Sequence, residues 1–207
     1  MASTTPRSVA PHVPCPSHRA CSPSAGLTLL EVVIAISVLM VVAAGVAPLF
    51  ATTQASLTDA HDQTMTAVLG RAKLDQLQGL TWGHAALASG ATAAVADLAT
   101  DLSTEPPGLG GPGLQPGSTD TIWRDTPGYI DYLDADGRWI GAGPGPPAGA
   151  VYVRRWAVTP LAGAAGDTLV LEVVASTVRA DRAAPRSGRV HRPGDTWLVT
   201  LKTRVRP

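Results

Sequence analysis

Cysteine is nearly absent from this 207-residue sequence, and both copies, Cys15 and Cys21, lie within the first 26 residues. A disulfide framework therefore cannot hold the rest of the chain together. Large aromatic side chains are also few, with one Phe, three Tyr and five Trp. Val, Leu and Ile must supply most of the core, and the abundance of Gly and Pro predicts long loops.

Net charge is absent as well, because 16 Lys and Arg balance 16 Asp and Glu. A neutral chain has no overall field to draw it onto nucleic acid. Arg7 and Arg19 are the only charged residues up to Gly26, so 14 basic and 16 acidic residues follow, a net charge of −2. The N-terminal segment is basic and the remainder is slightly acidic.

Catalytic motifs are missing too. The sequence has no Gly-x-Ser-x-Gly and no phosphate-binding loop, and His61, His84 and His191 are isolated from one another. We expect no enzyme activity and no cofactor.

One long hydrophobic run dominates what is present. Residues 32–51 are 20 consecutive residues without a charge, which as a helix would span about 30 Å, the thickness of a bilayer core. A secretory signal would have an apolar region of only about 7 to 15 residues. A buried helix of a soluble protein would not be apolar on every face. The run predicts one transmembrane helix.

The flanking charges predict the orientation of this span. Arg7 and Arg19 precede it, whereas the first basic residue after it is Arg71. The positive-inside rule then keeps the N-terminus in the cytoplasm and exports everything after about residue 52.

The helix is expected to continue beyond the span. Residues 55–78 contain no Pro, and Gly79 is a plausible C-terminal cap. Apolar residues recur at three- and four-residue steps: Met65, Val68, Leu69, Ala72, Leu74 and Leu77. We predict one helix over residues 27–79 whose second half packs on an exported domain.

The exported domain, residues 80–207, has its best strand signals at the end. Residues 151–158, 168–178 and 196–205 alternate partly and contain β-branched residues, which predicts an antiparallel meander. Residues 134–137 form a turn signal between runs at 129–133 and 138–140, which predicts a hairpin. Residues 83–120 indicate a long loop with one short helix near 91–102. The expected class is α+β.

The segment Gly26-Leu27-Thr28-Leu29-Leu30-Glu31 stands directly before the apolar run. It resembles the prepilin-type cleavage and methylation motif of type IV pilins and of type II secretion pseudopilins. The resemblance implies that a membrane-embedded prepilin peptidase cuts the Gly26-Leu27 bond on the cytoplasmic side and methylates the new amine of Leu27. Residues 1–26 would then be a removable leader.

Glu31 carries the second part of this resemblance. An acid at the head of a membrane span is costly to bury and is expected to have a partner. The resemblance implies that the partner is the terminal amine of a neighbouring subunit, which would neutralise Glu31 and set the register of assembly. The alternative is a boundary glutamate solvated by lipid headgroups.

Pro48 and Gly45 predict a kink or local melting near residues 44–48. Pro48 removes the hydrogen bond to the carbonyl of Ala44, and Gly45 loosens the same turn. Counted from Leu27, Pro48 is residue 22 (48 − 26), where many type IV pilins have a proline. Membrane helices also tolerate Gly and Pro in general.

Three binding sites are weaker hypotheses. His12, Cys15, His18 and Cys21 recur every three residues and could bind zinc, but they lie in the expected leader. Asp131, Asp134 and Asp136 could bind calcium, as some pseudopilins do, although a plain turn explains them better. Arg154, Arg155 and Trp156, with the loop 182–192, could bind single-stranded DNA, but a solvated face is the better interpretation, and nucleic acid is not an expected partner.

The sequence therefore predicts a minor prepilin, a structural subunit of a type IV pilus-like filament in the bacterial inner membrane. Its expected partners are the prepilin peptidase, other pilin or pseudopilin subunits, an inner-membrane assembly platform and membrane lipid. One alternative is a type II secretion pseudopilin. Another is an uncleaved single-pass anchor whose outer domain binds a ligand.

Overall fold

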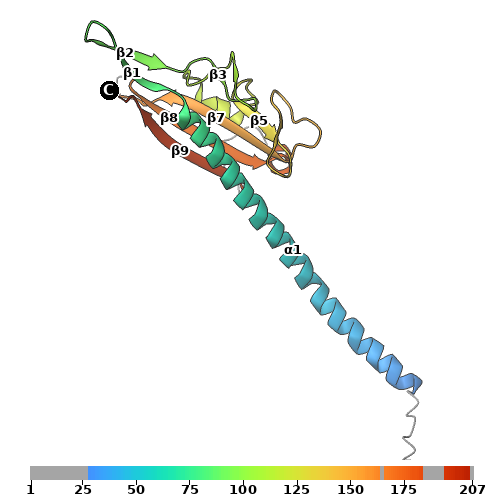
Figure 1. The fold of residues 1–207 in the computed structure, drawn as a ribbon. Coiled ribbons are helices and arrows are strands. Elements are labelled where there is room, and N and C mark those ends of the chain that lie inside the picture. The colour runs from blue at the N-terminus through green and yellow to red at the C-terminus, as the bar shows by residue number, and fades with distance from the viewer. Residues whose placement is uncertain (1–27, 164–165, 184–193, 206–207) are drawn as a thin grey trace, which may run out of the picture. The chain divides into compact units, whose positions relative to one another are not determined.

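The computed structural model describes residues 28–163, 166–183 and 194–205. The chain divides into two compact units, residues 1–49 and residues 50–207. Helix α1 (Leu29–Gly79) begins in the first unit and ends in the second (Figure 1). The long N-terminal helix and the antiparallel sheets that follow confirm the predicted α+β class.

Helix α1 is continuous over 51 residues. Pro48 lies inside it, and residues 44–48 keep helical structure, so the expected local melting does not occur. A proline removes one hydrogen bond, and the intact turns on both sides hold the helix together. A bend at Pro48 stays a prediction.

The main sheet of the second unit has five antiparallel strands in the order β6-β5-β7-β8-β9. The predicted hairpin is confirmed as β5 (Ile130–Leu133) and β6 (Trp139–Gly141). The three predicted C-terminal strands are β7 (Tyr152–Pro160), β8 (Thr168–Thr177) and β9 (Thr196–Thr203), paired as a meander. Helix α2 (Val178–Arg182), which the sequence did not predict, follows β8.

The structure of residues 82–109 differs from one prediction. The short helix expected near residues 91–102 is wrong, because these residues contribute to strands. Gly90, with φ of 79°, reverses the chain between β1 (Trp82–Ala86) and β2 (Thr92–Ala96), which pair along their full length. A second small pair, β3 (Thr100–Asp101) and β4 (Gly108–Leu109), follows, and then the 3₁₀ helix η1 (Thr119–Trp123). Strand pairing thus satisfies backbone groups that an Ala-rich helix would otherwise have satisfied internally.

Both faces of the sheet are covered, which is why β7 is buried along most of its length. The C-terminal half of α1 packs on the inner face, where Gly70 faces Ala175 of β8 and Leu198 of β9 (Figure 1). η1 packs on the outer face, where Ile122 contacts Ala157 and Val174. The main core lies between α1 and the inner face and contains Leu74, Leu77, Trp82, Leu102, Leu114, Tyr129, Trp156, Val158, Leu169, Leu171 and Val173.

Candidate functional site

The N-terminal turn of α1 contains the only predicted assembly residue that the structure describes. Glu31 is exposed in the first turn, and its backbone N–H donates to the carbonyl oxygen of Thr28 at 3.0 Å and to Thr28 Oγ1 at 3.3 Å. Thr28 and Glu31 have the spacing of a capping box, in which the N-cap hydroxyl accepts from the third helical residue. The acidic Glu31 side chain lies in the first turn, where a negative charge interacts favourably with the positive end of the helix dipole. Gly26 and Leu27 lie outside the described residues.

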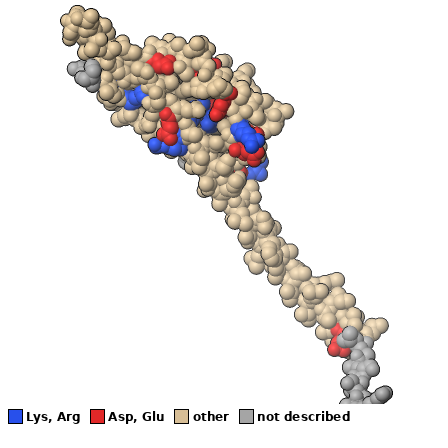
Figure 2. Space-filling view, in the orientation of Figure 1, with Lys and Arg blue, Asp and Glu red and all other residues tan. Residues whose placement is uncertain are grey.

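The first unit presents an apolar helical surface. An 18-residue stretch of α1 has a mean hydropathy of 2.7 and no buried residue. Within residues 28–163, 166–183 and 194–205, α1 is the one helix that is long and apolar enough to cross a bilayer. In Figure 2, coloured charged atoms gather over the second unit, and a long stretch of α1 shows none. A surface of this kind is unstable in water, so it indicates membrane anchoring.

Gly45 lies within this apolar segment. No heavy atom would meet a Cβ placed at Gly45, so the unit itself leaves room for a side chain there. Close packing inside the subunit therefore does not explain the glycine.

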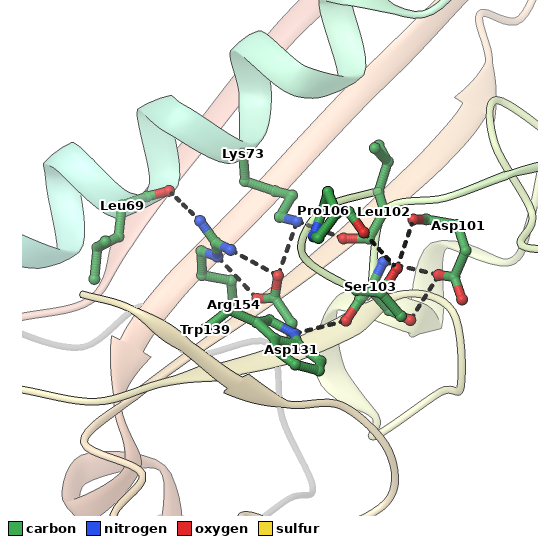
Figure 3. Close-up of polar contacts among 10 residues, drawn as sticks. Leu69, Lys73, Asp101, Leu102, Ser103, Pro106, Asp131, Trp139 and Arg154 are labelled. Carbon is green, nitrogen blue, oxygen red and sulfur yellow. Dashed lines mark hydrogen bonds and ion pairs between the residues drawn. The ribbon is translucent and has the colours of Figure 1, made fainter. Parts of the chain in front are cut away.

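A buried ion cluster joins α1 to the sheet of the second unit. It consists of Lys73 on α1, Asp131 on β5 and Arg154 on β7, and all three side chains are at most 3% exposed (Figure 3). Asp131 and Arg154 are partners in the β5–β7 register, and Arg154 donates to both carboxylate oxygens at 2.8 and 2.7 Å. Lys73 Nζ reaches one of these oxygens at 2.8 Å. We call these three residues the Lys73 cluster.

The cluster also holds two backbone carbonyl groups, one on α1 and one in the segment around Leu102. Lys73 Nζ donates to the carbonyl oxygen of Leu102 at 2.6 Å, and Arg154 donates to that of Leu69 at 3.4 Å. Lys73 Nζ lies 4.6 Å from the ring centroid of Trp156, within cation–π range. One carboxylate thus fixes the helix, two strands and the segment around Leu102 in a single arrangement.

Burial lowers the pKa of Lys73 from its ordinary 10.5 to about 8, and the negative charge of Asp131 offsets only part of this effect. The positive charge of Arg154 lowers it further. The cluster has one acid for two bases, which is why the acid cannot stabilise the lysine fully.

A second ion cluster lies on the outer face of the sheet. Arg155 of β7 donates to Asp125 at 2.6 Å and to Asp181 of α2 at 2.8 Å. Burial alone would lower the pKa of Arg155, but the hydrogen bonds and charges of Asp181 and Asp125 outweigh it and raise the pKa. This cluster fixes α2 and the segment after η1 on the sheet.

These clusters change the interpretation of two predicted sites. Arg154, Arg155 and Trp156 form neither a nucleic-acid patch nor a solvated face, because all three are buried. Both alternatives assumed that adjacent arginines must reach water, whereas β7 directs them to opposite covered faces. Residues 184–192 of the proposed patch lie outside the described residues, as do His12, Cys15, His18 and Cys21.

The calcium residues are not brought together. Asp131 is engaged by Lys73 and Arg154, whereas the Asp134 side chain accepts the backbone N–H groups of Asp136 and Arg138 at 2.9 and 2.8 Å and so forms the β5–β6 turn. In the part of the chain that the structure describes, no group of three or more His, Cys, Asp or Glu side chains could hold a metal ion. The plain turn is the better interpretation of this motif.

The comparison with known families concerns the N-terminal segment. Residues 21–47 match the family model described as the prokaryotic N-terminal methylation motif. This match confirms the resemblance of the N-terminal segment to type IV pilin-like proteins, and together with the apolar α1 it indicates membrane anchoring. No curated protein and no solved structure matches the chain.

Proposed function

We propose that this protein is a minor prepilin, cleaved after Gly26, methylated at Leu27 and assembled through α1 into a type IV pilus-like filament. The observation that carries the proposal is the methylation motif at residues 21–47, which leads directly into an apolar helix with no buried face. Such a helix needs lipid or other apolar helices around it, and a helical filament supplies the latter once the subunit leaves the membrane. The role is structural, without enzyme activity.

Cleavage depends on Gly26 because a residue without Cβ lets the backbone lie extended in a narrow peptidase site. Gly26→Ala is expected to leave most of the chain unprocessed when it is expressed with a prepilin peptidase. Ser24→Ala, two residues earlier in the leader, is the matched control and should be processed normally. Normal maturation of the Gly26 variant would contradict the proposed cleavage site.

Glu31 has two candidate roles that one pair of variants separates. Gln can still serve in a capping box but has no charge, whereas Asp keeps the charge on a shorter side chain. If Glu31 neutralises the terminal amine of a neighbour, Glu31→Gln is cleaved normally but is lost from sheared filaments, and Glu31→Asp retains part of its incorporation. If capping is the only role, Glu31→Gln assembles like the wild type.

The topology follows from the charges around the span. The proposal places residues 1–26 in the cytoplasm, where the peptidase acts, and residues 80–207 outside the inner membrane, as a periplasmic or filament-surface domain. A cysteine introduced at exposed Asp136 should react with a membrane-impermeant maleimide on intact spheroplasts, whereas Cys15 in unprocessed chain should react only after lysis. The reverse pattern would contradict this orientation.

The long loops and small sheet of the second unit favour a minor subunit rather than the bulk component of a filament. Quantitative mass spectrometry of sheared surface filaments should then find this chain at a small fraction of the most abundant pilin. Its absence from surface filaments, combined with peptidase-dependent maturation and loss of protein secretion on deletion, would favour the type II secretion pseudopilin instead.

A further inference from the structure

A small open pocket lies on the outer face of the sheet, between η1 and the edge strand β9. Its volume is about 140 Å³, enough for one compact headgroup rather than an extended ligand. The side chains that line it come from η1, β8 and β9: Thr119, Ile122, Trp123, Glu172 and Trp197.

Two tryptophans form adjacent walls of this pocket. The rings of Trp123 and Trp197 stand 5.8 Å apart between centroids with an interplanar angle of 84°. Ile122, which is buried against Ala157 and Val174, fixes the position of η1 and therefore of Trp123. Trp197 is 40% exposed, although tryptophan is the residue with most to gain from burial.

Glu172 supplies the one charged group of the pocket. It lies on β8 opposite Val199, two register positions from the pair formed by Val174 and Trp197 and so on the same face of the sheet, and it lines the pocket together with Trp197. Within the described ranges, no hydrogen bond or ion pair engages this carboxylate. The two cation–π contacts within those ranges involve Trp156 and Trp82, so no lysine or arginine of the described residues lies over the rings of Trp123 and Trp197.

We propose that this pocket binds an organic cation of the quaternary ammonium class, such as the trimethylammonium group of choline. Aromatic faces attract a cation through their quadrupole, and tryptophan does so most strongly. The Glu172 carboxylate supplies the opposite charge.

The choice of a quaternary over a primary ammonium follows from the polar groups present. A primary ammonium has three N–H donors that need acceptors when they leave water, and three of the five lining side chains, Ile122, Trp123 and Trp197, offer no acceptor. A trimethylammonium group has no donor to satisfy. It gains from contact with the apolar rings while its charge is balanced by the acid.

The test titrates choline chloride into the full chain in maltoside micelles, which carry no choline headgroup, at constant ionic strength. Binding is read from saturation transfer to the N-methyl protons and from tryptophan fluorescence. The comparison ligand is 3,3-dimethyl-1-butanol, which has the shape of choline without its charge, and ethanolamine represents the primary ammonium. We expect choline to bind at least about fivefold more tightly than either, a ratio that corresponds to about 1 kcal/mol of cation–π and ionic attraction.

Variants separate the pocket from non-specific binding. Glu172→Gln preserves the shape of the side chain and should weaken choline binding at least about fivefold, and Trp197→Leu should abolish the saturation transfer. Asp136→Asn removes an exposed charge elsewhere, and Leu201→Ala removes an exposed apolar side chain from the same strand, so both should bind choline like the wild type. Any of four results would overturn the proposal: equal binding of the neutral analogue, tighter binding of ethanolamine, unchanged binding by Glu172→Gln, or no binding of choline at all.

Discussion

Asp131→Asn is the substitution for which the structure predicts the largest loss of stability at the smallest change in shape. The asparagine side chain is nearly isosteric, but it carries no charge to balance Lys73 and Arg154, both of which are almost fully buried. Breaking a buried ion pair by removing one partner costs about 3 to 5 kcal/mol. Lys73 can limit this cost by releasing its proton, but Arg154 cannot, so we expect about 3 kcal/mol.

A loss of this size is a large fraction of the roughly 5 to 15 kcal/mol by which domains are stable. The assay is urea unfolding of the full chain in micelles at pH 7, followed by tryptophan fluorescence, because buried Trp156 reports on the cluster directly. The matched control is Asp75→Asn, which breaks an ion pair with Arg71 whose side chains are 52% and 63% exposed and should cost less than about 0.5 kcal/mol.

The double variant Asp131→Asn with Lys73→Met tests the electrostatic explanation itself. Replacing Lys73 should recover part of the stability that Asp131→Asn loses, because the double variant no longer has to bury or deprotonate the lysine and only Arg154 remains unbalanced. The reasoning is refuted if Asp131→Asn is within about 1 kcal/mol of the Asp75 control.

Further expectations concern pH and two glycines. Because burial lowers the pKa of Lys73 to about 8 from 10.5, the unfolded chain binds more protons between those pH values, and the free energy of unfolding should rise with pH there by at most roughly 3 kcal/mol. Lys73→Met should reduce this rise in urea titrations, leaving the part that comes from Lys202, whose pKa burial also lowers, and a fall in the wild type would contradict the assignment. Gly111→Ala should destabilise by about 2 kcal/mol or more, because its Cβ would lie 2.2 Å from the Asp101 Cα atom. Gly70→Ala, whose Cβ would sit at an ordinary 3.5 Å from its neighbours, should shift the urea midpoint little, and a larger loss there than at Gly111 would reverse the argument.

The parts of the fold that sequence patterns predicted are those with strong local periodicity. The long helix and the three C-terminal strands follow from runs of apolar and β-branched residues whose period matches one structure. The turn at 134–137 follows from Asp and Gly residues that close it by their own side-chain and backbone geometry.

The errors arise where distant partners decide the outcome. The apolar pattern suggested that Val68 faces the core, but it is 57% exposed, whereas Thr66, Gly70 and Lys73 are on the buried face. Lys73 can be buried because Asp131 and the Leu102 carbonyl are there to receive it, and neither is visible in the periodicity of α1. The signal available in the sequence was the position of Lys73, which lies four residues from both Leu69 and Leu77 and so shares their buried helical face.

The methylation motif could be recognised in the sequence for a different reason. Its residues are consecutive in the chain, so no fold is needed to bring them together. The pocket between Trp123 and Trp197 is the opposite case, because the two rings are far apart in sequence and meet only through the packing of η1 beside β9.

The most direct test of the proposed function is the mass and N-terminal sequence of the membrane-purified chain, expressed with and without a prepilin peptidase. We predict a peptidase-dependent N-terminus at Leu27, heavier by one methyl group, and an uncleaved chain when the peptidase is absent. An N-terminus that is the same in both cells would contradict the prepilin proposal and would make the uncleaved, membrane-anchored binding domain the leading explanation.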